Sequence, residues 1–164
     1  MTGMIRPSAG FTRRTLLATG AAALATPMLG RRANAQAIEL QMLAWYCHPE
    51  PDVVAEFAAE NNVKFVPKYY TGGDNMLGLI SQSPPGTFDV IYADQVLEHM
   101  SGVDAARALT AEARRALTAG GVFFVVVPDY LKERGFFWDI DYTHNFPTTE
   151  RRVRQLLYDG GFEI

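Results

Sequence analysis

The chain has 164 residues, of which 48% are hydrophobic, an ordinary composition for one globular domain. Its 15 basic and 18 acidic side chains give a net charge of −3, and the part after residue 35 keeps all 18 acids but only 10 bases, a net charge of −8. Nucleic acids and anionic membranes attract clusters of Lys and Arg, which that part lacks, so both are excluded as partners. The single cysteine, Cys47, excludes an internal disulfide bond.

The first 35 residues have the pattern of an export signal. Thr12–Leu17 contains a twin-arginine pair, Ala18–Leu29 is small and apolar, and Ala33–Ala35 is typical of a cleavage site. The apolar run is too short for a membrane span of about 20 residues, and no span is expected after cleavage. The sequence therefore predicts an exported or periplasmic protein; a disordered or membrane-tethered amino terminus is the alternative.

After this segment, the apolar pattern alternates between strand and helix. This alternation predicts a mostly parallel sheet with covering helices. The expected elements are a strand at 38–46, a helix at 51–61, a strand at 64–70, a helix at 74–82 and a strand at 88–93.

The segment up to residue 93 resembles the start of the extracellular solute-binding proteins of ABC importers, in particular those that bind polyamines. The resemblance rests on the export signal, on Leu43–Tyr46, on Pro51–Val54, on Gly73–Leu77 and on Pro85–Val90. It implies an ABC permease as partner and a ligand held by three side chains, which are Trp45, Tyr46 and Asp74. Alternatively, the two aromatic residues are ordinary core or rim residues.

The second half begins with the strand at 88–93, which leads into polar residues, the usual place for a site in an open parallel sheet. A helix is expected at 104–118, ended by Gly120 and Gly121 because glycine tolerates the left-handed conformation of a helix end. The uninterrupted apolar run at 122–127 predicts a central strand buried on both faces.

Residues 87–164 resemble the second half of the class I S-adenosylmethionine-dependent methyltransferases. The matching segments are Phe88–Ile91, Val96–His99, the glycine pair with the strand that follows it, and Leu156–Glu163. The resemblance implies S-adenosylmethionine as cofactor, with Asp94, Gln95 and Val96 beside it. It also implies Glu98 and His99 as catalytic residues, with His99 as the base. A packing or capping role for His99 is the alternative.

Two cofactor-binding features of that family are not recognisable. The family holds the cofactor with a glycine-rich loop after its first strand and an acid at the end of its second. Here Gly72–Asn75 reads as a simple turn, and Glu39 does not stand at a strand end. The sequence therefore predicts an incomplete cofactor site.

Two groups of residues could in principle bind a metal, but no metal is predicted at either of them. Asp139, Asp141 and His144 lie in a segment, 138–146, that by the resemblance would cover the substrate. Three such residues in a short loop are more often hydrogen-bonded to one another. The group from Cys47 to Asp52 is splayed by two prolines, so no metal is predicted at either place.

The chain ends with a helix capped by Thr148 or Thr149 and stopped by Gly160 and Gly161, followed by the start of a strand at 162–164. The expected fold is α/β, a small three-layer sandwich with a mostly parallel sheet, an incomplete Rossmann-like methyltransferase half.

The expected organisation is a signal at 1–35, a solute-binding-like segment at 36–86 and a truncated methyltransferase-like segment at 87–164. The primary function hypothesis is a methyltransferase acting on an unidentified small molecule, which would place it in the cytoplasm. A periplasmic solute-binding fragment and an inactive fusion product are the alternatives.

Overall fold

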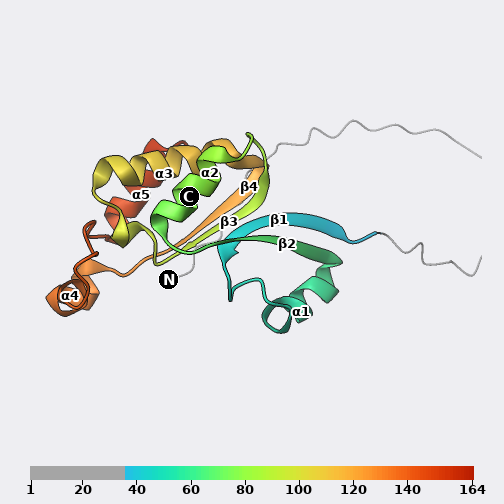
Figure 1. Ribbon diagram of the computed structural model, residues 1–164, viewed down its shortest axis with the longest axis horizontal. Helices are drawn as coiled ribbons and strands as arrows, with labels where there is room; N and C mark the ends of the chain where they lie inside the picture. The colour runs from blue at the N-terminus through green and yellow to red at the C-terminus, as the bar shows by residue number, and fades with distance from the viewer. Residues whose placement is uncertain (1–35) are drawn as a thin grey trace, which may run out of the picture.

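The computed structural model describes residues 36–164, and the predicted export signal lies outside them. Four parallel strands form one sheet in the order β2-β1-β3-β4 (Figure 1), which confirms the predicted α/β fold with a parallel sheet. The strands are β1 (Ile38–Trp45), β2 (Val63–Tyr70), β3 (Phe88–Asp94) and β4 (Leu117–Val126). The two segments predicted to have different origins thus contribute two strands each to a single sheet.

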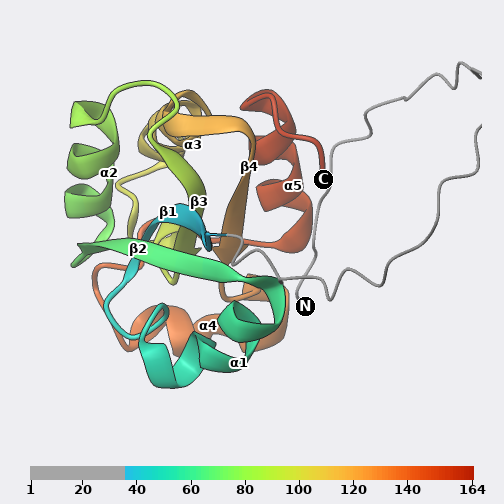
Figure 2. The same cartoon turned by 90° about the vertical axis from the view of Figure 1, so that its right-hand side faces the viewer.

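The helices lie on both sides of the sheet. Helices α2, α3 and α5 lie together over one face, and α1 lies on the other side, against β2 (Figures 1 and 2). Helix α4 follows β4 beyond the carboxyl end of the sheet. The helices are α1 (Pro51–Asn61), α2 (Gly73–Gln82), α3 (Val103–Ala116), α4 (Tyr130–Asp139) and α5 (Glu150–Asp159), with a short 3-10 helix, η1 (Leu97–His99). No helix among residues 36–164 is long and apolar enough to cross a membrane.

The core lies between the sheet and the α2–α3–α5 layer. Helix α3 turns one apolar stripe inward, in which Ala106, Leu109 and Ala113 are fully buried, while its arginines stay at the surface or half-buried. Leu43 of β1 and Ile91 of β3 are also fully buried in this cluster. Burying each such leucine or isoleucine stabilises the fold by roughly 1.5–3 kcal/mol.

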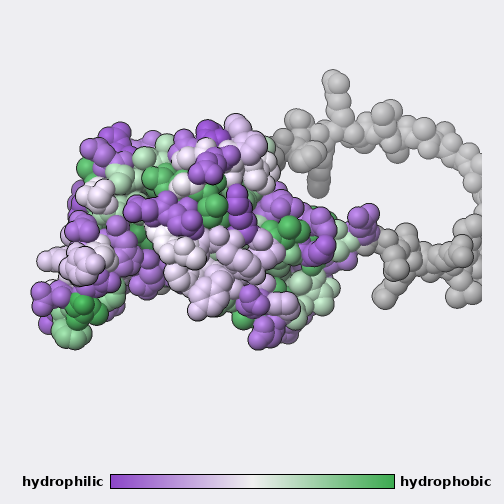
Figure 3. Space-filling view, viewed as in Figure 1, coloured by the Kyte–Doolittle hydropathy of each residue, from purple (hydrophilic) through white to green (hydrophobic). Residues whose placement is uncertain are grey.

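Apolar side chains also reach the surface. On α1, Val53 and Phe57 are exposed, and on α4 Leu131 and Phe136 are 75% and 79% exposed. In the space-filling view, green patches stand among polar residues on the part of the surface formed by α4 (Figure 3).

The predicted helix end at the glycine pair is wrong. Helix α3 ends at Ala116, and β4 already begins at Leu117 and runs through Gly120 and Gly121. The pairing of β3 with β4 is irregular between Phe88 and Val90, so the glycines belong to a strand irregularity. Gly120 has φ of +81°, and a Cβ at Gly121 would lie 3.1 Å from the carbonyl oxygen of Asp89, which explains both glycines.

Two further expectations at the carboxyl end differ from the structure. The sequence pattern did not predict α4, whose helical conformation is interrupted at Arg134. The predicted strand at 162–164 is not formed, and Phe162 instead packs its ring 5.4 Å from that of Phe123. The predicted helix before it is confirmed as α5, with the Thr149 side chain accepting a hydrogen bond from the N–H of Arg152.

Strands β1 and β3 separate towards their carboxyl ends, and Tyr70 fills the gap. The two strands are paired only at Met42 with Val90 and at Leu43 with Ile91. Beyond these pairs, the Tyr70 hydroxyl donates to the carbonyl oxygen of Tyr92 at 3.0 Å and accepts from the N–H of Asp94 at 3.1 Å. Burial raises the pKa of Tyr70 to about 12, so the hydroxyl keeps its proton.

The variant Tyr70→Phe tests this bridge. It leaves a carbonyl and an N–H of β3 without their partner, so we expect the free energy of unfolding to fall by about 1–3 kcal/mol. The matched control is Tyr69→Phe, because Tyr69 is exposed and its hydroxyl reaches only Glu50 at 3.3 Å. Urea unfolding measures both, and equal stability of the two variants would contradict a structural role for the Tyr70 hydroxyl.

Candidate functional site at the carboxyl edge of the sheet

The strand order reverses between β1 and β3, and ligands of open parallel sheets bind outside the carboxyl ends of strands at such a point. Here two side chains from the adjoining loops meet. The His48 Nε2 atom lies 3.0 Å from Asp94 Oδ2, and the His48 ring lies 4.4 Å from that of Tyr92. Asp94, predicted to lie beside the cofactor, is therefore engaged by a histidine of the same chain.

The residues at this point do not fit S-adenosylmethionine. The loop after β1, residues 46–50, contains no glycine, and Pro49 and Pro51 have no N–H to offer a ligand. Strand β2 ends in the buried Tyr70, where the family uses an acid. The prediction of an incomplete cofactor site therefore stays a prediction.

A cavity of about 480 Å³ lies beside the reversal point, within the usual size range of small-molecule sites. It opens between the start of α2, the residues around η1 and the loop after α4. Its lining residues are Gly72, Gly73, Asp74, Gln95, His99, Ser101, Thr143 and Asn145. The structure thus brings together three predicted site residues, Asp74, Gln95 and His99, although the sequence assigned them to two different functions.

Local backbone features shape this cavity. Gly73 starts α2, and a Cβ there would meet the terminal methyl group of Met100, which would have to move aside. Gln95 has φ of +53°, an uncommon conformation for a residue with a side chain. Its N–H donates to the carbonyl oxygen of Val126 at 2.9 Å, which fixes the turn that carries its side chain to the cavity.

His99 is connected to the loop after α4 through Thr143. The His99 Nδ1 atom lies 2.8 Å from Thr143 Oγ1, and that hydroxyl donates to Asp141 Oδ1 at 2.7 Å. Burial, together with the neighbouring His144, lowers the pKa of His99. Hydrogen bonds from Thr143 lower the pKa of Asp141. At neutral pH His99 is therefore a neutral imidazole at the cavity wall.

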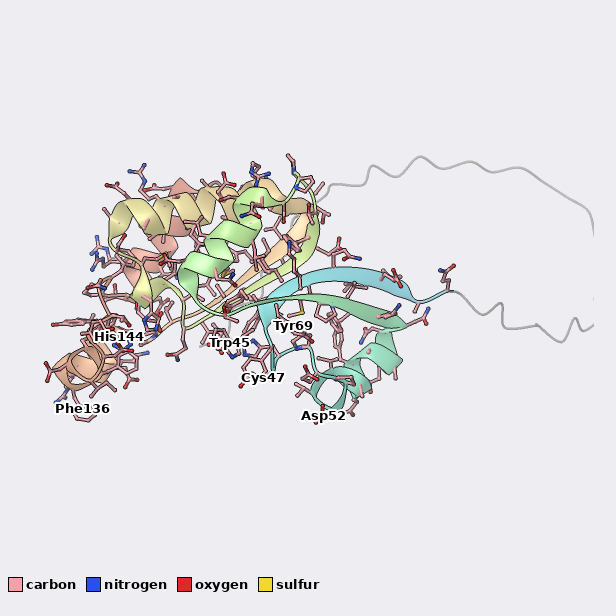
Figure 4. All side chains as sticks on the ribbon, in the orientation of Figure 1. Trp45, Cys47, Asp52, Tyr69, Phe136 and His144 are labelled. Atoms are coloured by element: carbon pink, nitrogen blue, oxygen red, sulfur yellow. The ribbon has the colours of Figure 1, made fainter. Side chains whose placement is uncertain are left out.

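The other predicted site residues do not line the cavity. Val96 and Glu98 are buried, with 2% and 0% of their surface exposed. Trp45 packs its ring 5.6 Å from that of Tyr70, and Tyr46 is 61% exposed beside it. Figure 4 shows Trp45 and Cys47 near the loop between β1 and α1, with His144 to their left, beside α4. The cavity does not unite Trp45, Tyr46 and Asp74 as the solute-binding resemblance implied.

Sequence reasoning missed the residues that the loop after α4 contributes. Thr143 and Asn145 come from the segment that was expected to cover a substrate, but neither was singled out. Ser101 was missed because serine is common at the surface. The sequence analysis grouped Asp139 with Asp141 and His144, whereas the structure places His99 with them. Residue spacing along the chain could not reveal this, because His99 lies far from the other two in the sequence.

Residues 47–125, slightly less than half of the chain, match the model of a family described as methyltransferase domain. The family implies S-adenosylmethionine as cofactor. The matched range crosses the junction predicted near residue 86. No curated protein matches the chain.

Two solved structures share the fold. One is a SAM-dependent methyltransferase from Archaeoglobus fulgidus, with a TM-score of 0.55 and 14% identity over 76% of this chain and 61% of that one. The other is a putative sarcosine dimethylglycine methyltransferase from Galdieria sulphuraria, with a TM-score of 0.50 and 12% identity. The match covers 77% of this chain and 55% of that one. The chain thus spans less than two thirds of either. None of these matches bears on the solute-binding resemblance, which stays a prediction.

Glu98 provides a pH test of the site's interior. Its two carboxylate oxygens are buried without a hydrogen-bond partner, and burial, with a smaller contribution from Asp94, raises its pKa to about 7. Between pH 4.5 and 7 the folded chain therefore holds a proton that the unfolded chain has lost, and stability falls as pH rises through this window.

We expect Glu98→Gln to remove this loss. The difference in unfolding free energy between the variant and the unmodified chain should shift in favour of the variant by on the order of 2–3 kcal/mol when the pH is raised from 4.5 to 8. Urea unfolding at both pH values measures the gain. The control is Glu60→Gln on the exposed side of α1, which should leave the pH profile unchanged. Parallel profiles for Glu98→Gln and the unmodified chain would show that Glu98 does not titrate in this range.

Proposed function

We propose that this chain binds a small amine in the cavity at the carboxyl edge of the sheet, in the position of a methyl acceptor, and does not itself use S-adenosylmethionine. The observation that carries the proposal is the composition of the cavity lining. One carboxylate, Asp74, stands among neutral amide, hydroxyl and imidazole groups, and none of the eight lining residues is Lys or Arg. Such a lining favours a cationic ligand over an anionic one.

The geometry of the cavity supports a ligand of limited size. Thr143 and Asn145 come from the loop that the methyltransferase resemblance assigned to the substrate, and they face the start of α2 across the cavity. The amide of Gln95 and the hydroxyl of Ser101 offer acceptors for an ammonium group.

The second part of the proposal rests on the reversal point between β1 and β3. There the His48–Asp94 pair, the ring of Tyr92 and a loop with two prolines stand where the family's cofactor loop would approach its ligand. A cofactor would have to displace the His48–Asp94 contact and would gain few backbone donors in exchange. The cavity therefore offers polar groups to a methyl acceptor, whereas the reversal point lacks the groups with which the family holds its cofactor.

Calorimetric titration of the full chain with S-adenosylmethionine and S-adenosylhomocysteine tests the cofactor side. We expect no saturable heat up to about 1 mM ligand, an affinity weaker than roughly −4 kcal/mol. A thermal melt of the same sample confirms that the protein is folded. A dissociation constant below about 100 μM for either compound would overturn this part of the proposal.

Putrescine and 1,4-butanediol test the acceptor side, because they share a carbon chain and differ in charge. We expect putrescine to bind and the diol not to bind. Asp74→Asn should weaken putrescine binding by about 1 kcal/mol, roughly fivefold, because an exposed ion pair contributes up to that amount. The matched control is Asp104→Asn, an exposed acid in the first turn of α3 outside the cavity. Equal binding of both compounds, or no effect of Asp74→Asn, would contradict the amine assignment.

A further inference from the structure

We propose that His99, Asp141 and His144 form a binding site for a divalent transition metal, with zinc as the best match, at the wall of the cavity. The three residues are half-buried, and one potential ligand atom from each lies within 4.8 Å of the others. Two imidazoles and one carboxylate are a common zinc ligand set and leave a fourth position open. The ligands of a tetrahedral zinc lie roughly 3.3 Å apart, so atoms that now lie within 4.8 Å of one another must approach by up to about 1.5 Å on binding.

His144 is held with one nitrogen facing the other ligands. Its Nδ1 atom lies 2.9 Å from the carbonyl oxygen of Phe137, which can only accept, so Nδ1 carries the hydrogen and Nε2 keeps its lone pair. Nε2 lies 3.9 Å from Asp141 Oδ2. The ring stacks on Phe137 at 4.5 Å and meets Trp138 edge-on, and the side chain is only 6% exposed. A backbone carbonyl on the second nitrogen is the usual support of a metal-binding histidine.

Asp141 also has one committed oxygen and one that faces the cluster. Its Oδ1 accepts from both the N–H and the hydroxyl of Thr143, at 2.8 Å and 2.7 Å. Its Oδ2 is the atom that faces His144. The carboxylate is thus oriented by its own loop, in the manner of a metal ligand whose other oxygen is hydrogen-bonded.

The hydrogen-bond direction at His99 follows from Thr143. The Thr143 hydroxyl donates its single hydrogen to Asp141, so towards His99 Nδ1 it can only accept, and Nδ1 carries the hydrogen. The Nε2 atom of His99 then has the free lone pair. All three residues therefore keep one lone-pair atom available, while the Phe137 carbonyl and Thr143 fix the other side of each.

Metal binding to the full chain, stripped with EDTA and free of any histidine tag, tests the site. We expect one equivalent of Zn²⁺ by calorimetry, and Co²⁺ should give the visible absorption of a low-symmetry site. Zn²⁺ should also raise the melting temperature, because it binds only the folded chain. His99→Gln and Asp141→Asn should each weaken Zn²⁺ binding more than tenfold. Thr143→Val, which removes the shared support, should weaken it by about 10–100-fold.

Two variants serve as matched controls. Asp139→Asn removes an exposed acid two residues from Asp141, and His48→Gln removes a histidine outside the cluster. Both should bind Zn²⁺ like the unmodified chain. Circular dichroism shows whether each variant is folded, and Thr143→Val keeps the test valid where a ligand variant does not fold. Absence of stoichiometric binding, or binding that persists in His99→Gln and Asp141→Asn, would mean that the cluster is a hydrogen-bonded loop only.

Discussion

The separation of β1 from β3 at their carboxyl ends is the constraint on which the candidate site depends. Where β1 and β3 separate, a carbonyl and an N–H of β3 lose their strand partner. The Tyr70 hydroxyl forms hydrogen bonds with both groups, so neither is left unsatisfied. The pairing of His48 with Asp94 and the left-handed turn at Gln95 both lie just beyond this bridge.

The same edge explains why one chain resembles two families. In any open parallel sheet, the loops at the carboxyl ends carry the ligand-binding residues, so a solute-binding opening and a methyltransferase half place their candidate residues on the same side. Asp74 and Gln95 were assigned to different functions, yet they line one cavity. The reversal point and the cavity differ in chemistry. Aromatic side chains and the His48–Asp94 pair lie at the reversal point, and small polar side chains line the cavity.

Residues with a clear local pattern were predicted well. The four strands and helices α1, α2, α3 and α5 were predicted from their apolar pattern. Helices α2, α3 and α5 bury residues in the core, whereas α1 buries none. Strand β4 starts earlier than predicted and lies at the edge of the described sheet, so the prediction of a central strand buried on both faces was wrong. The glycine pair was misread, since glycine serves a helix end and a strand irregularity equally, and only the nearby Asp89 carbonyl decides between them. Helix α4 is interrupted at Arg134, and its apolar residues form no stripe along one side that a sequence pattern could reveal. His99 was predicted as a site residue from its motif, but its contact with Thr143, 44 positions away, depends on tertiary structure.

The loop after α4 links the cavity to the rest of the fold through few contacts. The N–H of Phe146 donates to the carbonyl oxygen of Glu98, and His99 meets Thr143, so both connections run to η1. Because α4 itself buries no residue, these contacts and the packing of Phe146 determine where Thr143 and Asn145 stand. A metal held by His99 and by two residues of the loop would add a third connection at the same place. It would order the loop that carries Thr143 and Asn145 before a ligand arrives, while its positive charge would oppose a cationic ligand at the same wall.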